Sequence, residues 1–341
     1  MALLAIETSC DETSVAVIEQ GRTLANVVSS QVRMHEEYGG VVPELAAREH
    51  LKNLLPVARK ALGEAKVSAG GVKAVAATQG PGLPGALMIG LKAGQALAFC
   101  LRRPFVGIHH HEAHLYSPWI KGNPPTADFS EFEPNVSLIV SGGHTMLVHV
   151  ESELKHRVMG STMDDAAGEC FDKVGKLLGL AYPAGPLIDR LAGNGNPDAF
   201  DFPRPMISDA GDDFSFSGLK TSVRYFVRDH PGIAENTQGL ADLCASVQKA
   251  IVDVLVTKVI RAARRLRAGC VTASGGVTCN RRFRLELSDA CEREKLRLRL
   301  AEGALCTDNA AMIGILAERK LMSGESATDF DADILPGWRL R

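Results

Sequence analysis

Short apolar runs separated by polar turns open the chain. Residues 3–7 form one apolar run, and a polar turn over residues 8–14 follows it. Two further apolar runs, 15–19 and 24–29, flank a turn that contains Gly21. Short apolar runs bounded by turn residues are typical of strands, so this segment predicts three successive strands.

The same pattern returns in the middle of the chain. Residues 135–140 are apolar, 141–145 read Ser-Gly-Gly-His-Thr, and 146–150 are again largely apolar. A third run lies near residues 158–162. The two segments are about 130 residues apart. We interpret them as a weak internal repeat in which each copy begins with a strand, a polar turn and a strand.

Helical segments follow the strands in both halves. Residues 43–62 and 164–178 are predicted helices, and residues 72–85 and 269–276 each run from an apolar strand into a Gly-rich turn. Strands that feed Gly-rich turns are typical of α/β layering, with binding sites at the strand ends.

These observations predict an α/β protein of duplicated, RNase H-like domains, arranged as in actin, Hsp70 and the sugar kinases and facing across a central cleft. In that architecture two hairpin turns hold the phosphates of a nucleotide. The predicted first domain covers residues 1–118, closed by a C-terminal helix at about 309–330, and the second covers residues 119–308.

Composition narrows the class of protein. The 341 residues carry 38 Lys and Arg against 40 Asp and Glu, which argues against a strongly basic nucleic-acid binder. The eight cysteines form no C-x-x-C pair, which favours a reducing compartment. The N-terminus lacks a basic region, and the apolar stretch 80–101 contains two prolines, Lys92 and Gln95. We therefore expect a cytoplasmic protein with no membrane contact.

The segment His-His-His-Glu-Ala-His at 109–114 is the strongest candidate for chemistry. His110 and His114 are four residues apart, so on a helix both side chains lie on one face and can bind one transition metal. The alternative is a His-rich helix start without a ligand. A zinc peptidase is excluded, because position 115 is Leu115 and H-E-x-x-H is therefore not formed.

A third metal ligand has to come from elsewhere in the chain. Asp308 is a candidate, and it would complete a set of two histidines and one carboxylate that suits Fe(II) or zinc. Asp308 also precedes an apolar helical run, where it could instead be an N-cap. The spacing alone leaves both interpretations open.

Several polar positions are candidates for nucleotide contacts, each with a structural alternative. The glycines of the 141–145 turn expose backbone N–H groups that suit phosphate, but a tight hairpin turn also needs them. Asn280, after Gly275 and Gly276, could bind a base or ribose. Asp172 could bind a ribose or pair with Lys176. For Asp189 a ligand contact and a structural role are likewise both possible.

Arginine is concentrated between residues 261 and 299. A solvated helix face is the default interpretation of such a run, and a phosphate-binding surface is the alternative.

Nine blocks of sequence, in order, resemble one family. They are residues 6–14, 35–50, 78–85, 109–114, 141–145, 164–173, 214–221, 273–280 and 306–314. Together they are similar to the bacterial tRNA N6-adenosine threonylcarbamoyltransferase family, formerly called glycoprotease or O-sialoglycoprotein endopeptidase. The resemblance extends from residue 3 to about residue 320.

The resemblance implies transfer of the threonylcarbamoyl group of threonylcarbamoyl-AMP to N6 of the adenosine 3′ of the anticodon, in tRNAs that read ANN codons, with release of AMP. It implies one Fe(2+) per subunit, or Zn(2+) in some preparations. The implied metal ligands are His110, His114 and Asp308, and His111 is a possible competing ligand.

The resemblance also implies a donor site and partners. The implied adenylate-binding residues are Ile139, Val140, Ser141, Gly142, Gly143, Asp172, Gly185, Asp189 and Asn280. Asp11 and Glu12, on the first hairpin turn, could accept the proton of the amine, or could cap the turn or repel excess nucleotide. The implied partners are tRNA, a metal-less paralogue of the same fold and a small P-loop ATPase. The arginine-rich stretch would then be part of the tRNA surface.

Two other functions are compatible with the predicted fold. A kinase would bind ATP with Mg-binding carboxylates on both hairpin turns, and the Ser-Gly-Gly-His-Thr turn has none. A non-catalytic scaffold would not need the histidines of 109–114, and they are present.

Overall fold

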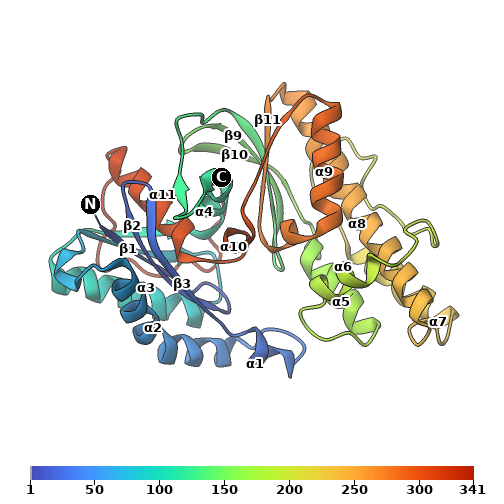
Figure 1. The fold of residues 1–341 in the computed structure, drawn as a ribbon, viewed down its shortest axis with the longest axis horizontal. Coiled ribbons are helices and arrows are strands. Elements are labelled where there is room, and N and C mark those ends of the chain that lie inside the picture. The colour runs from blue at the N-terminus through green and yellow to red at the C-terminus, as the bar shows by residue number, and fades with distance from the viewer. Residues whose placement is uncertain (1) are drawn as a thin grey trace. The chain divides into compact units, whose positions relative to one another are not determined.

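The structure, a computed structural model, describes residues 2–341. The chain folds into two compact units (Figure 1). The first unit combines Met1–Glu131 with Thr307–Arg341, and the second unit is Phe132–Cys306. Each unit contains one β-sheet with helices packed on it (Figure 1).

The first unit is built on a seven-stranded sheet with the order β5-β4-β1-β2-β3-β7-β6. Its strands are β1 (Leu3–Glu7), β2 (Glu12–Glu19), β3 (Arg22–Ser30), β4 (Ala74–Gly80), β5 (Phe105–His109), β6 (Ile120–Lys121) and β7 (Thr126–Ala127). Strands β1, β2 and β3 are antiparallel, whereas β4 and β5 run parallel to β1. The three predicted strands are confirmed, but β2 begins inside the predicted turn because Glu12 pairs with Ser30 of β3.

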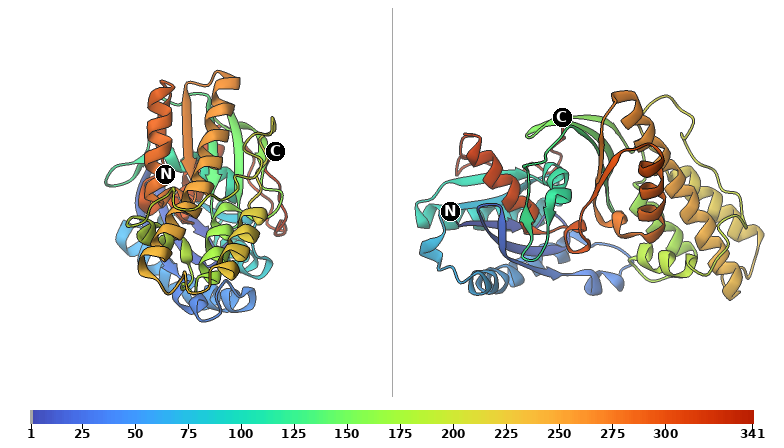
Figure 2. Two further views of the ribbon diagram at one scale, coloured as in Figure 1. Left: turned by 90° about the vertical axis from the view of Figure 1, so that its right-hand side faces the viewer. Right: turned by 45° about the horizontal axis from the view of Figure 1, so that its top comes forward.

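Helices cover both faces of this sheet. The helical segments are α1 (Val32–Glu36), α2 (Pro43–Ala65), η1 (Ala69–Gly71), α3 (Pro84–Leu101), α4 (His110–Tyr116), η2 (Ser117–Trp119) and α11 (Ala310–Met322). Helices α2 and α3 pack together on one face, and α11 crosses the opposite face (Figure 2, right). The alternation of side chains along β1 explains this layering: Ala5 points to Gly314 of α11, and Ile6 points to Gly90 of α3.

Helix α3 is, within residues 2–341, the one helix long and apolar enough to cross a membrane by length and composition. Its inner side packs on β4, and its residues Leu87, Leu91 and Ala98 are buried. Both Lys92 and Gln95 donate hydrogen bonds to the carbonyl of Ala332, at 3.1 and 2.8 Å. The polar positions of α3 are therefore used inside the first unit.

The last residues of the chain form an extended strap on the first unit. Thr328 N–H donates to the Phe105 carbonyl at 2.7 Å, and Leu335 N–H donates to the Gln79 carbonyl at 2.8 Å. The strap then brings the ring of Trp338 to 4.7 Å from that of His109.

The second unit repeats the connectivity of the first. Its strands are β8 (Asn135–Val140), β9 (Thr145–Ser152), β10 (Lys155–Ser161), β11 (Cys270–Ser274) and β12 (Arg297–Leu300), in the order β10-β9-β8-β11-β12. As in the order β3-β2-β1-β4-β5, three antiparallel strands are followed by two parallel ones. The predicted duplication of an RNase H-like α/β unit is therefore confirmed.

Helices of the second unit form much of its core. They are α5 (Ala167–Leu177), α6 (Ala184–Ala192), α7 (Ser217–Asp229), α8 (Thr237–Leu266), η3 (Gly276–Cys279), α9 (Arg281–Arg293) and α10 (Gly303–Cys306). The long helix α8 packs against both α6 and α9 (Figure 1). The predicted helix 164–178 begins later, at Ala167, because Asp164 accepts hydrogen bonds from Ser215 and Ser217 at the start of α7.

The segment between the predicted domain boundary at residue 118 and Glu131 belongs to the sheet of the first unit. It contains β6 and β7, and Thr126 of β7 pairs with Arg22 of β3. Backbone pairing with a strand far away in sequence decides this assignment, and no local pattern in the segment reports it.

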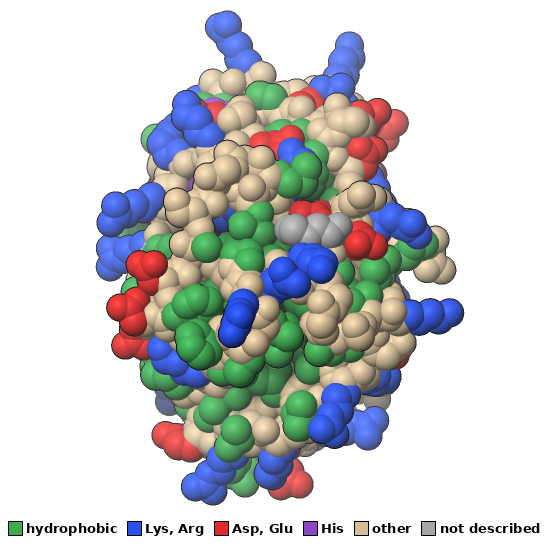
Figure 3. Space-filling view, turned by 90° about the vertical axis from the view of Figure 1, so that its left-hand side faces the viewer, with side chains coloured by type: hydrophobic (Ala, Val, Ile, Leu, Met, Phe, Trp, Pro, Cys, Tyr) green, Lys and Arg blue, Asp and Glu red, His purple; other side chains and the backbone are tan. Residues whose placement is uncertain are grey.

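The surface of the first unit carries large apolar side chains. Leu51 and Leu55 of α2 are 68% and 58% exposed, and Phe99 at the end of α3 is 69% exposed. On the face of the molecule shown in Figure 3, hydrophobic side chains gather in the middle and lower part, with lysines and arginines among and around them.

Candidate functional site

The histidines of residues 109–114 lie where β5 passes directly into α4. His109 is the N-cap of α4, and its ring Nδ1 accepts a hydrogen bond from the Glu112 N–H at 3.4 Å. His110 and His114 follow on one face of this short helix, with their rings 4.8 Å apart, and both are buried. The helix thus presents two imidazoles side by side, as their spacing predicted.

The carboxylate of Asp308 completes the group within the first unit. Its Oδ1 lies 3.4 Å from Nε2 of His110 and 3.3 Å from Nε2 of His114. One donor atom from each of the three residues lies within 4.8 Å of the others. Two ligands about 2.1 Å from one metal at a tetrahedral angle are about 3.4 Å apart, so the three side chains fit a transition-metal ion.

Asp308 is not the N-cap of α11 in the structure. Asn309 caps α11, because its side-chain oxygen accepts the Met312 N–H at 3.2 Å. The Asn309 amide nitrogen also donates to the Thr307 carbonyl at 2.8 Å, which fixes the segment that carries Asp308. Asp308 is thereby free to face the two histidines.

Glu7, at the end of β1, orients His110 from behind. Its Oε2 lies 3.0 Å from Nδ1 of His110, and Thr78 donates its hydroxyl to the same oxygen at 2.6 Å. Ser9 donates its N–H to Oε1 of Glu7, and its hydroxyl lies 3.2 Å from Nδ1 of His110. A carboxylate behind a histidine holds the proton on Nδ1 and leaves Nε2 for a metal.

Burial and the neighbouring charges act in opposite directions on the pKa values of His110 and Asp308. Burial opposes a charge on His110, but the carboxylates of Asp308 and Glu7 raise its pKa well above the usual value. For Asp308, burial acts to raise the pKa, and the two histidines lower it well below its usual range. Burial lowers the pKa of His114, which favours the neutral imidazole that a metal needs.

His111 lies outside the three-residue group, since helical rotation points it away from the face shared by His110 and His114. Its ring contacts the rings of His109 and His110, with centroids 5.5 and 5.6 Å away.

Asp11 and Glu12 follow the same β1–β2 turn that contains Ser9. The side chain of Asp11 is buried, and Oε1 of Glu12 accepts a hydrogen bond from the Ser30 hydroxyl at 3.4 Å. Burial, together with the neighbouring carboxylates of Asp11 and Asp308, raises the pKa of Glu12 well above its usual value. A carboxyl group with a raised pKa is a stronger base once it is ionised.

In the second unit, the turn between β8 and β9 has the geometry of an anion cradle. Ser141 N–H donates to the His144 carbonyl at 2.8 Å, and the Ser141 hydroxyl accepts the His144 N–H at 3.1 Å. Gly142 and Gly143 are exposed, and no heavy atom lies within 4 Å of where a Cβ on either would be. Open backbone N–H groups of this kind suit a phosphate oxygen.

Two close approaches hold this turn in place. Gly168, at the start of α5, donates its N–H to the Ser141 carbonyl at 3.2 Å. Gly275, which has φ of 95°, lies so close to β8 that a Cβ there would be 2.3 Å from the Val140 carbonyl oxygen. Ile139 and Val140 are fully buried at the end of β8, so their backbone, more than their side chains, forms the edge of the turn.

Three of the other predicted donor-site residues hold protein groups. Asp172 accepts the Ala184 N–H at 2.8 Å, at the start of the helix that contains Gly185. Asp189 pairs with Arg281 at 2.9 Å. Asn280 caps α9 by accepting the Phe283 N–H, and donates to Gln248 at 2.8 Å. For Asp172 the bond goes to the Ala184 N–H, and not to Lys176 as its structural alternative predicted. The ligand roles of these three residues stay predictions.

Several arginines of the arginine-rich stretch are engaged in ion pairs. The partners are Glu294 for Arg264, Asp212 for Arg265 and Glu133 for Arg297. Arg284 donates to the carbonyls of Thr278 and Ala301 at 2.6 and 2.8 Å. For these four residues the structural interpretation is favoured over a free phosphate-binding surface.

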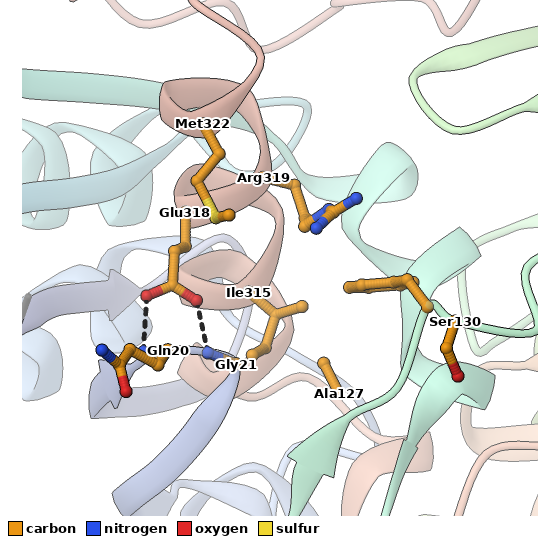
Figure 4. Close-up of a pocket in the computed structure, with 9 residues that line it drawn as sticks. Gln20, Gly21, Ala127, Ser130, Ile315, Glu318, Arg319 and Met322 are labelled. Carbon is orange, nitrogen blue, oxygen red and sulfur yellow. Dashed lines mark hydrogen bonds between the residues drawn. The ribbon is translucent and has the colours of Figure 1, made fainter.

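A cavity of about 690 Å³ lies elsewhere in the first unit, between the β2–β3 turn and α11 (Figure 4). Both carboxylate oxygens of Glu318 in its wall accept backbone N–H groups, from Gln20 at 2.8 Å and Gly21 at 2.6 Å. None of its lining residues belongs to the histidine site. Its one acidic group is committed to the β2–β3 turn, so the cavity adds nothing to the site.

Sequence reasoning missed the residues that orient the histidines. Glu7 had a detectable signal, since a charged residue at the end of an apolar strand needs a partner. The contact of Trp338 with His109 had none, because it depends on a strap more than two hundred residues further along the chain.

Comparisons with known proteins bear on this arrangement. Residues 22–315 match a family model described as tRNA N6-adenosine threonylcarbamoyltransferase. A Syntrophotalea carbinolica protein with that name is 45% identical, over 100% of this chain and 97% of its own length. An Anaeromyxobacter protein with the same name is 48% identical over 100% of both chains.

Solved structures show the fold alone. HypF from T. kodakarensis superposes with a TM-score of 0.63 at 13% identity, over 96% of this chain and 49% of that one. Component A of (R)-2-hydroxyglutaryl-CoA dehydratase from Acidaminococcus fermentans superposes with a TM-score of 0.54 at 12% identity, over 94% and 99% of the two chains.

Proposed function

The chain belongs to the tRNA N6-adenosine threonylcarbamoyltransferase family, and we propose that it transfers the threonylcarbamoyl group of threonylcarbamoyl-AMP to N6 of the adenosine 3′ of the anticodon in tRNAs that read ANN codons. A bond forms between N6 and the carbamoyl carbon, the bond from that carbon to the phosphate oxygen breaks, one N6 proton is lost and AMP leaves. The group of two buried histidines, His110 and His114, with the half-buried Asp308 is the observation that carries this proposal beyond the fold.

A transition metal is the cofactor that this group supports. We propose Fe(2+), one per subunit, with Zn(2+) as the alternative occupant, because two imidazoles and one carboxylate suit both ions. When bound, the ion supplies Lewis acidity toward a carbonyl or carboxylate oxygen of the donor. Glu7 keeps Nε2 of His110 available by holding the proton on Nδ1.

The second unit is the proposed site of the adenylate. The turn at Ser141, Gly142 and Gly143 would bind the phosphate through the open backbone N–H groups of Gly142 and Gly143, and would stabilise the charge that develops as AMP leaves. The Ser141 N–H already donates to the His144 carbonyl. Open space around the two glycines supports this assignment. The remaining proposed contacts are the backbone of Ile139, Val140 and Gly185 and the polar side chains of Asp172, Asp189 and Asn280.

Asp11 or Glu12 is the proposed acceptor of the N6 proton. The exocyclic amine of adenine is a poor nucleophile, so precise placement contributes as much as proton transfer. The raised pKa of Glu12 supports the role, since a carboxylate with a raised pKa binds a proton more tightly.

We also propose partners for this reaction in the cytoplasm. They are tRNA, a metal-less paralogue of the same fold and a small P-loop ATPase. Leu51 and Leu55 lie four residues apart on the outer side of α2 and are mostly exposed, which supports a protein partner on that helix.

A reconstituted reaction tests the function. The purified chain is mixed with the metal-less paralogue, the P-loop ATPase, threonylcarbamoyl-AMP and unmodified tRNA. The tRNA is then digested and analysed for threonylcarbamoyl-adenosine by its mass. The matched variants are His110→Ala/His114→Ala and His149→Ala, a partly exposed histidine of the second unit.

The possible outcomes separate the alternatives. Product with the parent and with His149→Ala, and neither metal nor product with the double variant, would support the metal-dependent transferase. Full product with the metal-free double variant would leave the transferase and reject the metal role. No product with the parent beside active partners would favour a non-catalytic scaffold. Phosphate transfer from ATP by the purified chain alone, measured in a separate reaction, would favour a kinase.

A further inference from the structure

Two fully buried histidines lie in the first unit outside the metal group. His35 is on α1 and His50 is on α2, and both are 0% exposed. Neither has a role in the proposed reaction. Burying an imidazole is costly unless its nitrogens are hydrogen-bonded, so the partners of each ring indicate what it does.

The first half of the network fixes the tautomer of His35. The backbone N–H of Val42 lies 3.3 Å from Nδ1 of His35. A backbone N–H can only donate, so Nδ1 must accept and the proton of a neutral His35 must be on Nε2. Nε2 of His35 lies 3.3 Å from Oε1 of Gln31, which accepts a hydrogen bond from the Nε2–H group.

Gln31 in turn fixes the tautomer of His50. With Oε1 facing His35, its amide nitrogen lies 3.3 Å from Nδ1 of His50 and can only donate to it. The hydroxyl of Thr13 lies 2.8 Å from the same Nδ1. Nδ1 of His50 therefore accepts, and the proton of His50 is on Nε2.

The network ends on the backbone of the β1–β2 turn. Nε2 of His50 lies 2.9 Å from the carbonyl oxygen of Cys10, and a carbonyl can only accept. We call this series of Val42, His35, Gln31, His50 and Cys10 the histidine relay. A group that can only donate stands at one end and one that can only accept at the other, so each histidine has one possible neutral tautomer.

Cys10 is the residue between the two functional parts of the turn. Ser9 before it contacts both Glu7 and His110, and Asp11 and Glu12 after it are the proposed proton acceptors. Gln31 also donates its backbone N–H to the Asp11 carbonyl at 3.0 Å. Two consecutive carbonyls of the turn are therefore held by the relay.

We propose that His50 is a positioning residue: as the Nε2–H tautomer it holds the Cys10 carbonyl, and so sets the position of the turn from Ser9 to Glu12 beside the metal group. His35 and Gln31 keep His50 in that tautomer. None of the relay residues touches the three metal ligands, so His50 acts through the turn.

The charges around His50 agree with a neutral ring. Burial lowers its pKa, and His35 acts in the same direction. The bond to the Cys10 carbonyl and the carboxylates of Glu7 and Asp11 oppose this effect, and the pKa remains below its usual value. A second proton on His50 would be on Nδ1 and would face the donors of Thr13 and Gln31.

Substitution of His50 separates positioning from packing. His50→Leu keeps most of the volume but removes the donor, and His50→Gln retains an N–H that can reach the Cys10 carbonyl. We expect His50→Leu to lower kcat by at least about tenfold with KM for tRNA and bound metal unchanged, because a displaced turn misplaces Asp11 and Glu12 in the transition state without changing substrate binding. We expect His50→Gln to recover most of kcat.

The role of His50 rests on the proposed reaction, and the outcomes distinguish the two. A parent chain without product rejects the transferase. An active parent with equal kcat in His50→Leu, or a loss that His50→Gln does not recover although it folds, rejects the role of His50 alone.

A direct measurement on the parent keeps the proposal testable if His50→Leu fails to fold. Two-bond proton–nitrogen NMR correlations of protein labelled with 15N-histidine report which ring nitrogen carries the proton. The His50 signals are those that are absent from the spectrum of His50→Gln. The Nε2–H tautomer at pH 7 is expected, and an Nδ1–H or doubly protonated ring would overturn the proposal.

Discussion

Glu7 and His110 form a buried pair in which Oε2 of the carboxylate lies 3.0 Å from Nδ1 of the imidazole. Glu7 ends β1 and His110 begins α4, so the pair connects β1, an inner strand of the sheet, to the helix that carries both His110 and His114. Thr78, on the neighbouring β4, donates its hydroxyl to the same oxygen. The orientation of His110, the first proposed metal ligand, is thus set by two adjacent strands.

Removing the charge of Glu7 should weaken metal binding without unfolding the chain. In Glu7→Gln the amide cannot hold the Nδ1 proton as a carboxylate does, and loss of such a partner lowers metal affinity by about 10- to 100-fold. Metal titration by calorimetry measures the change, with Glu64→Gln, an exposed ion-pair residue of α2, as the control. Parental affinity in Glu7→Gln would contradict the assignment.

Substitutions of His114 and His111, three positions apart in α4, should differ sharply in their effect on metal content. His114→Ala removes a ligand and should leave little bound metal after dialysis, whereas His111→Gln should retain the parental amount because His111 is outside the ligand group. Elemental analysis of both variants, with circular dichroism as a check of folding, makes the comparison. Equal loss of metal in the two variants would make His111 a ligand.

An added methyl group at two glycines of the second unit should change two different properties, KM at one position and stability at the other. Gly142→Ala has open space, so stability should be unchanged while KM for threonylcarbamoyl-AMP rises. Gly275→Ala would place a Cβ 2.3 Å from the Val140 carbonyl oxygen at a φ of 95°, and should destabilise the chain by about 1–3 kcal/mol.

Denaturant unfolding and steady-state kinetics of both glycine variants test this pair. An unchanged KM in Gly142→Ala would argue against a phosphate cradle at the turn. An unchanged free energy of unfolding in Gly275→Ala would argue against the close approach.

Asp164 should make the second unit sensitive to acid. Partial burial acts to raise its pKa, but hydrogen bonds from Ser215, Ser217 and the Phe216 N–H lower it to about 2, below the ordinary 3.8. A pKa that is lower in the folded state stabilises the fold above the unfolded pKa. That stability is lost as the pH falls from about 3.8 toward 2.

Urea unfolding of the parent and Asp164→Asn between pH 6 and 2.5 measures this contribution. We expect the parent to be more stable at pH 6 and the difference to shrink below pH 4. Asp201→Asn, at an almost fully exposed side chain, serves as the control. A difference that stays constant down to pH 2.5 would show that the charge of Asp164 does not support the start of α7.

The sequence by itself determined the repeated unit and the pair of histidines. Strands and helices follow from local hydrophobic periodicity, and the spacing of His110 and His114 places both rings on one helix face whatever surrounds them. The same local logic located the Ser-Gly-Gly turn, because glycines between two apolar runs expose backbone N–H groups in any hairpin.

Only the tertiary structure decided which partners these residues have. The sequence left Asp308 between ligand and cap, and the contact of Asn309 with Met312 excluded the cap. The ligand role of Asp308 stays a prediction. The orientation of His110 by Glu7, and of the turn by His50, joins residues 103 and 40 positions apart. Such contacts depend on strand register and helix packing across the whole unit, and no local pattern of residue types encodes them.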